Sequence, residues 1–212
     1  MKTILRYIVS IIFIASGFVK AVDLKGFSFK LEEYFSPIVF DLPFLEKYAL
    51  AFAIMVVLLE LILGFMLLMK IKLKQAIYAL IAICIFFGFL TFYSAYYNVV
   101  TDCGCFGDAV KLTNLQSLIK NIILIVCAAV VTWKPLAMMR FISKSTQWIV
   151  INYTILFILL SSGYSLYYLP QFDFRPYYIG ASIRDGMTIP KGAKQPKFDT
   201  SFILEKNGVR KE

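Results

Sequence analysis

The chain has no histidine among its 212 residues. Histidine is the side chain that most often serves as general base, proton shuttle and metal ligand near neutral pH. Charged residues are also scarce, at 17% of the chain, whereas 60% of the residues are hydrophobic and the mean hydropathy is +0.76. Soluble domains are usually about 45–50% apolar. This composition predicts an integral membrane protein.

Acidic residues are fewer than basic ones, 13 against 22, which leaves a formal net charge of +9. Such an excess can indicate a nucleic-acid partner, but here the lysines cluster at the ends of apolar runs. Lysine and arginine in short loops orient membrane proteins by staying on the cytoplasmic side. We therefore expect membrane lipid, and no nucleic acid, as a partner.

Long apolar runs dominate the chain, and each is close to the roughly 20 residues that cross about 30 Å of hydrocarbon as a helix. The runs cover residues 4–19, 45–69, 76–97, 115–133 and 148–169. They predict an all-α fold, a transmembrane bundle of four helices plus a fifth. Trp133 and Trp148 border one basic loop, as expected of aromatic residues at a membrane interface.

The basic clusters orient these spans. Lys2 and Arg6, residues 70–74, and residues 134–144 all fall on one side of the membrane if five segments cross it. The positive-inside rule makes that side cytoplasmic. The prediction is a multi-pass protein of a bacterial inner membrane, with its N-terminus in the cytoplasm and its C-terminus outside.

The remaining segments are polar or mixed. Residues near 25–38 have apolar side chains at helical spacing, which predicts a short helix lying in the membrane surface. Residues 170–212 form an extracytoplasmic tail, in which Asn207-Gly208 between short apolar-containing runs favours a β-hairpin. We expect a membrane domain over 1–135, a basic loop and fifth helix over 136–169, and the tail, which reads as the start of a truncated region.

The most chemically distinctive stretch is Thr101-Asp-Cys-Gly-Cys-Phe-Gly-Asp108, between the third and fourth apolar runs. A disulfide between Cys103 and Cys105 would close a small, strained ring, and strain makes a disulfide more oxidising. Gly104 gives the backbone the freedom that this closure needs. The predicted orientation puts the turn outside the cytoplasm, where disulfides form.

Three functions remain open for this turn. It can exchange disulfides with a partner, it can act as a structural clamp, or it can bind a metal. Two thiols without an imidazole make the metal site the weakest alternative. Flanking carboxylates of Asp102 and Asp108 would raise the pKa of the thiols, which argues against a fast nucleophile.

Glu60 lies deep inside the second apolar run, ten residues before Lys70 and therefore about 15 Å from it along a helix. A carboxylate at this depth is costly unless it is paired inside the bundle. Arg6, early in the first run, is a candidate partner. The alternative is a structural buried carboxyl bonded to a neighbouring helix. Lys20 is most simply interpreted as an interfacial anchor.

Three further groups of residues have structural interpretations. Cys84 and Cys127 lie in the middle of two spans and read as small buried apolar residues. Thr113 or Asn114 is expected to cap the fourth long helix. Tyrosines at the end of the third run predict an interfacial belt, with a quinone pocket as the alternative; they are Tyr93, Tyr96 and Tyr97.

These residues together carry a family resemblance. The first run ends Ala15-Ser-Gly-Phe-Val-Lys20, a loop has Phe29-Lys-Leu-Glu-Glu-Tyr34, the second span carries Glu60 and Gly64, and the turn reads Cys103-Gly-Cys-Phe-Gly-Asp108. Over about residues 1–135 the chain resembles the DoxX-like proteins, and more narrowly their MauE branch in forms seen in Bacteroidetes.

The resemblance implies a four-helix bundle related in outline to membrane thiol oxidoreductases such as DsbB and the vitamin K epoxide reductase. It also implies a role in maturing disulfide-rich exported proteins. The family takes its name from one of these, methylamine dehydrogenase. A fifth helix and a tail depart from that pattern, and nothing in the sequence points to methylamine metabolism.

Our expectation is therefore a redox-associated membrane protein whose Cys103 and Cys105 exchange disulfides with a thioredoxin-like or secreted thiol protein. Gly104, Phe106, Gly107 and Asp108 would support the turn, and Glu60 with Arg6 would stabilise the bundle, or handle a proton if a quinone accepts the electrons. A second pair of cysteines suited to passing electrons on to a quinone is not evident. The rival hypothesis is a non-enzymatic scaffold or assembly factor in which the turn is a brace.

Overall fold

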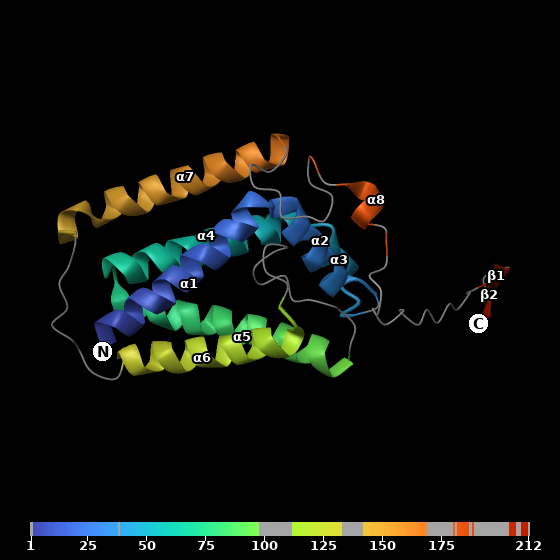
Figure 1. Cartoon of the computed structure of the whole chain (residues 1–212), viewed down its shortest axis with the longest axis horizontal. Coiled ribbons are helices and arrows are strands. Elements are labelled where there is room, and N and C mark those ends of the chain that lie inside the picture. Colours follow the sequence, from blue (N-terminus) through green and yellow to red (C-terminus); the bar gives the residue numbers. More distant parts are fainter. Residues whose placement is uncertain are drawn as a thin grey trace. The chain divides into compact units, whose positions relative to one another are not determined.

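The computed structural model describes residues 2–37, 39–97, 112–132 and 142–168, and in the tail 180, 182–186, 188, 204–206 and 209–211. Its long helices, seen in Figure 1, are α1 (Lys2–Val22), α4 (Ala49–Met69), α5 (Leu73–Tyr97), α6 (Asn114–Thr132) and α7 (Gln147–Tyr167). All five are long and apolar enough to cross a membrane. The predicted all-α bundle with five spans is confirmed.

Four of these helices close a ring. Helix α1 packs against α4, α4 against α5, α5 against α6, and α6 returns to α1. The most extensive contacts are those of the α1–α4 and α5–α6 pairs. Helix α7 stands outside the ring and contacts α4 and α1, as Figure 1 shows. The packing therefore separates a four-helix core from an additional fifth helix, as the sequence predicts.

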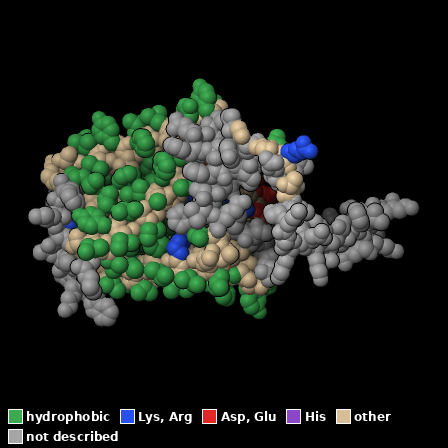
Figure 2. Space-filling view, in the orientation of Figure 1, with side chains coloured by type: hydrophobic (Ala, Val, Ile, Leu, Met, Phe, Trp, Pro, Cys, Tyr) green, Lys and Arg blue, Asp and Glu red, His purple; other side chains and the backbone are tan. Residues whose placement is uncertain are grey.

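The outer surface of the bundle is apolar. Figure 2 shows hydrophobic side chains covering much of the visible face of the long helices. Large apolar side chains point outward from every long helix, among them Ile11, Met55, Phe89, Ile123 and Phe157. A contiguous exposed apolar surface of this kind is stable in lipid rather than in water. The protein is therefore a multi-pass membrane protein in contact with lipid.

Two short helices connect α1 to α4. Helix α2 (Leu24–Phe35) begins at Asp23, whose carboxylate accepts a hydrogen bond of 3.0 Å from the backbone N–H of Gly26. One face of α2 is buried, with Phe27, Leu31 and Tyr34 nearly inaccessible, and α2 packs mainly against α4. Helix α3 (Pro43–Glu46) follows, so α4 starts four residues later than its apolar run.

The start of α6 is set by a capping box. The backbone N–H of Gln116 donates to Thr113 Oγ1 at 3.3 Å, and the backbone N–H of Thr113 donates to Gln116 Oε1 at 3.1 Å. This reciprocal pair satisfies N–H groups that a helix terminus otherwise leaves unpaired. Of the two caps expected from the sequence, Thr113 is the one that the structure uses.

Outside the long helices and their connections, the structure describes four short elements. A 3₁₀ turn, η1 (Lys144–Thr146), precedes α7, and contacts within the chain divide it into residues 1–175 and 176–212. In the second unit lie α8 (Ile183–Gly186) and two strands, β1 (Leu204–Lys206) and β2 (Val209–Lys211). The strands pair antiparallel with Glu205 opposite Arg210, the arrangement expected of a hairpin around residues 207–208.

Glycines bring α1 and α4 unusually close. A Cβ atom built on Gly64 would lie 2.7 Å from Ile14 Cγ1 and 3.2 Å from the backbone nitrogen of Ile14. On the facing helix, a Cβ atom on Gly17 would lie 2.8 Å from Leu61 Cγ. Small residues let membrane helices pack backbone against backbone, where dispersion contacts replace the hydrophobic effect that lipid removes.

Replacing Gly64 by alanine is expected to destabilise the bundle by about 1–3 kcal/mol, because the added methyl group must displace the α1 backbone. Gly88→Ala on α5 is the matched control, since a Cβ atom there meets nothing within 4 Å. The control should be neutral or slightly stabilising because alanine favours a helix over glycine. Denaturant unfolding in detergent micelles measures both, and equal stabilities would contradict the close α1–α4 contact.

Candidate functional site

A buried ion pair joins α1 to α4. Lys20 Nζ donates to both carboxylate oxygens of Glu60, at 2.7 and 2.8 Å, and to Ser16 Oγ at 3.1 Å. The Ser16 hydroxyl in turn donates to Glu60 Oε2 at 3.3 Å. The three donors of the ammonium group are thereby used, and the side chains of Lys20 and Glu60 are only 1% and 5% exposed.

Aromatic rings shield the ammonium group. Lys20 Nζ lies 5.0 Å from the ring centre of Phe87 on α5 and 5.3 Å from that of Phe27 on α2. A cation at such distances is attracted by the negative face of the ring. Lys20 therefore contacts residues from three other helices, and the pair is neutral as a whole. Neutrality and complete hydrogen bonding are what make buried charges tolerable in an apolar surrounding.

This geometry corrects two interpretations made from the sequence. Lys20 is not an interfacial anchor, because it is 1% exposed and points into the bundle. Arg6 is not the partner of Glu60, because Lys20 occupies that place. Arg6 and Lys20 are fourteen residues apart on one helix, or about 21 Å, so a carboxylate bonded to one cannot reach the other.

Arg6 is itself buried, at 1% exposure, with its guanidinium carbon 4.7 Å from the ring centre of Tyr7. Its Nε and Nη1 atoms have no hydrogen-bond partner among the described residues. Seven-residue spacing puts Arg6, Phe13 and Lys20 on one face of α1. That face is the buried one, since Val9 and Phe13 between the two cations are also inaccessible.

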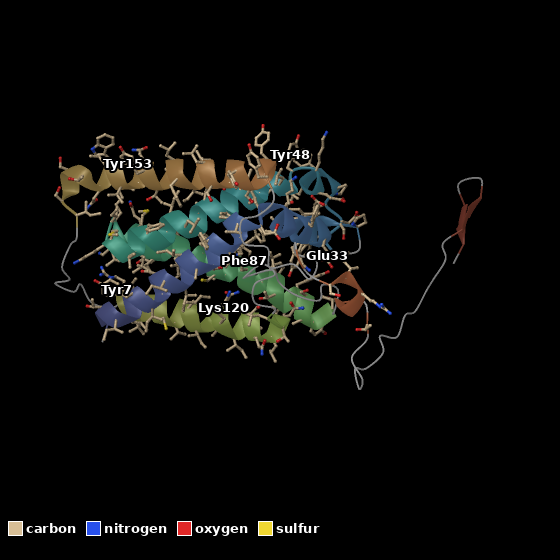
Figure 3. All side chains as sticks on the ribbon, turned by 45° about the horizontal axis from the view of Figure 1, so that its top comes forward. Tyr7, Glu33, Tyr48, Phe87, Lys120 and Tyr153 are labelled. Atoms are coloured by element: carbon tan, nitrogen blue, oxygen red, sulfur yellow. The ribbon has the colours of Figure 1, made fainter. Side chains whose placement is uncertain are left out.

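A small cavity of about 20 Å³ adjoins the ion pair. Ser16, Lys20 and Glu60 line it from α1 and α4, and Asn121 and Lys120 line it from α6. Figure 3 labels Lys120 on α6 and Phe87 on α5, two of the side chains that surround it. The cavity lies where the four helices of the ring meet, and five polar or charged side chains line it: Ser16, Lys20, Glu60, Lys120 and Asn121.

A separate apolar groove of about 370 Å³ lies between α2, α4 and α5. Leu31, Phe52, Leu59 and Phe86 are among its lining residues. Phe87 borders both the groove and the polar cavity, so its ring separates the ion pair from this lipid-like surface.

Two of the four cysteines, Cys84 and Cys127, lie among the described residues. Cys84, on α5, is 2% exposed and lines the polar cavity, which confirms that it is buried. Cys127, on α6, is half-buried among apolar side chains. The stretch Thr101–Asp108, with Cys103 and Cys105, lies outside the described residues. It connects Tyr97, where α5 ends, to Asn114, where its packing partner α6 begins.

The tyrosines at the end of α5 form a cluster of tilted and edge-to-face rings. Tyr93 and Tyr97 have ring centres 4.6 Å apart, and Tyr96 and Tyr97 5.0 Å apart. The Tyr93 hydroxyl donates to the backbone oxygen of Val39 at 3.2 Å, while Tyr96 and Tyr97 are largely exposed. These contacts fit interfacial residues that also hold the segment before α3 in place.

Sequence reasoning missed Ser16, Asn121 and the role of Lys20. One available signal was register: Lys20 follows Phe13 by seven residues and Ser16 by four, so all three share a helix face. A second was charge matching, because Glu60 is the one carboxylate within the five described long helices. Asn121 gave no such signal, since only the packing of α6 against α1 brings it to the cavity.

Comparison with protein families gives a match that covers more than half of the chain. The family model described as methylamine utilisation protein MauE matches residues 1–134, which include α1 to α6 but not α7 or the tail. No curated protein and no solved structure matches the chain significantly.

Breaking the ion pair one side at a time should be costly. Lys20→Met or Glu60→Gln alone is expected to lower the free energy of unfolding by about 3–5 kcal/mol, because each leaves a buried group without its charged partner. The double variant should lose less than the sum of the two, by roughly 1–3 kcal/mol. Unfolding in mixed detergent micelles measures the free energies of unfolding of the native chain, the two single variants and the double variant.

The partly exposed pair of Lys30 and Glu33 provides the control, since its nitrogen–oxygen distance is 3.8 Å and its side chains are 26% and 40% exposed. Lys30→Met and Glu33→Gln should each change stability by less than about 1 kcal/mol. If the Lys20 and Glu60 variants behaved like these, the ion pair would not be holding α1 to α4.

Proposed function

The chain belongs to the MauE family, and we propose that it exchanges disulfides with thiol proteins outside the cytoplasm through Cys103 and Cys105. The observation that carries the proposal is the Cys-Gly-Cys turn within the region that the family model matches. A membrane-embedded member of a family associated with maturation of exported proteins has a use for a surface dithiol, since such proteins acquire disulfides after export.

The packing of the bundle supports this proposal. Helices α5 and α6 make one of the two most extensive contacts, so the segment between them is attached to two helix ends that stay together. Thr113 and Gln116 fix the first turn of α6 directly after that segment. The Lys20–Glu60 pair and the α1–α4 contact hold the opposite side of the ring. Reactive groups need a rigid support, and these helix ends can provide one.

The exchange proceeds through two thiolate attacks. A thiolate of one protein attacks a sulfur of the other protein's disulfide, so that a mixed disulfide forms and one cysteine sulfur leaves as thiolate. A second thiolate then attacks the mixed disulfide and releases the two proteins. Two electrons pass to the protein that held the disulfide, and the protons lost by the attacking thiols balance those taken up by the leaving thiolates.

A trapping experiment tests the proposal. Cys105→Ser leaves Cys103 able to form a mixed disulfide but unable to resolve it, so a covalent adduct with an exported thiol protein should accumulate in membranes. Non-reducing electrophoresis with mass spectrometry detects it. Cys127→Ser, at a half-buried position inside α6, is the matched control. Added to Cys105→Ser, it should leave the amount of adduct unchanged.

The rival function, a scaffold in which the turn is only a brace, gives the opposite result. No adduct would form with Cys105→Ser, and the double variant Cys103→Ser/Cys105→Ser would lower stability instead. Differential thiol labelling of intact membranes adds the redox state: a redox pair should change with the oxidant supplied, whereas a brace should stay oxidised.

Topology is a separate prediction. With the N-terminus in the cytoplasm, a reporter active only outside should work when fused after Gly107 and fail when fused after Lys72, in the short α4–α5 connection. The reverse pattern would place the two cysteines in a reducing compartment and remove the setting for the exchange.

A further inference from the structure

The cavity beside the ion pair contains a hydrogen-bond donor without an acceptor. Asn121 is 4% exposed, and its Nδ2 atom has no hydrogen-bond partner among the described residues. A buried amide donor left unpaired costs about 1–3 kcal/mol. Asn121 lines the same cavity as Ser16, Lys20 and Glu60, so an acceptor in that space would satisfy it.

The cavity also contains acceptor capacity. Among the described residues, Glu60 Oε2 accepts hydrogen bonds from Lys20 and from Ser16, whereas Oε1 accepts one, from Lys20. A carboxylate oxygen has two lone-pair sites. Glu60 Oε1 therefore has room for one more donor, and Glu60 lines the cavity.

The volume and charge of the cavity select the ligand. A space on the order of 10–15 Å³ holds one water, and water occupies buried spaces that offer two to four polar partners. The cavity measures about 20 Å³ and offers Asn121, Glu60 and Ser16. A cation there would face Lys20 and Lys120, and an anion would face Glu60, so a small neutral molecule fits best.

We propose that this cavity is a hydration site, in which a water molecule accepts a hydrogen bond from Asn121 Nδ2 and donates one to Glu60 Oε1. The water ties α6 to the Lys20–Glu60 pair and completes a polar link around three helices of the ring. It is also the path by which protons of the Lys20 ammonium group exchange with solvent. This inference does not depend on the chemistry of Cys103 and Cys105.

The arrangement of α6 indicates where that solvent enters. Asn114, Ser117 and Asn121 recur at spacings of three and four residues, so they share one face of α6. Asn114 Nδ2 donates to Ser94 Oγ on α5 at 3.4 Å, and Ser117 is inaccessible. Polar side chains thus lead from the end where α5 stops and α6 starts toward Asn121, while Lys120 at the cavity is half-buried.

Nuclear magnetic resonance on the full-length, ¹⁵N-labelled protein in lipid nanodiscs tests the site. The Asn121 side-chain amide is assigned by its disappearance in Asn121→Leu. Magnetisation transferred from water should give a cross-peak at this amide. An assigned amide without a water cross-peak would overturn the hydration site.

Two variants of opposite size test the exchange path. Asn121→Leu fills the cavity with an apolar side chain, so exchange of the Lys20 ammonium protons should slow by roughly tenfold or more, because it then requires local opening. Asn121→Ala enlarges the cavity and should leave the exchange as fast as in the native chain or faster. Equal rates in all three proteins, or slowing in both variants, would contradict the path.

Ser162→Ala is the control for general effects. Ser162 on α7 is also 4% exposed with an unpartnered Oγ among the described residues, but it does not line the cavity. This variant should leave both the Asn121 cross-peak and the Lys20 exchange rate unchanged. A tenfold change in the Lys20 exchange rate in Ser162→Ala would mean that the effects of Asn121→Leu come from a general change in the bundle. That result would contradict the proposed exchange path.

Discussion

The hydrogen-bonded ion pair between Lys20 and Glu60 is the interaction on which this bundle depends. An unpaired charge inside a membrane-spanning bundle is costly, so each member of the pair requires the other. The requirement fixes the rotation of α1 and α4 about their own axes, because only one register brings Lys20, Ser16 and Glu60 together. Phe27 and Phe87 then bring α2 and α5 against the same ammonium group.

The close approach of α1 and α4 makes that interaction achievable. Gly17 and Gly64 remove the side chains that would separate the helices, and Gly17 lies one turn from Lys20. Apolar contact in a membrane gains little from excluding water, so short backbone distances and internal hydrogen bonds have to supply the cohesion. The glycines and the ion pair therefore act on one interface, and α5 with α6 closes the ring around it.

The two chemically interesting places in this protein are of different kinds. The Cys-Gly-Cys turn is a sequence feature that carries the proposed exchange with partners. The polar cavity is a feature of packing, formed by side chains from α1, α4, α5 and α6, and its polar lining residues are up to 105 positions apart, from Ser16 to Asn121. Both involve the α5–α6 hairpin, whose connection contains the turn and whose second helix contributes Asn121. Although the two places share this hairpin, separate variants test them: Cys105→Ser tests the turn, and Asn121→Leu tests the cavity.

Sequence alone determined the five spans, the all-helical class and the family resemblance, because about twenty apolar residues in a membrane have few alternatives to a helix. It also determined that Glu60 needs a partner and that Thr113 is a candidate cap. Only the tertiary structure decided that the partner is Lys20 rather than Arg6, and that Lys20 is buried instead of anchoring the chain at an interface. The reason is physical: hydropathy reports the depth of a residue along its own helix, whereas pairing depends on helix rotation and crossing, which are set jointly by glycine contacts, rings and charges on several helices.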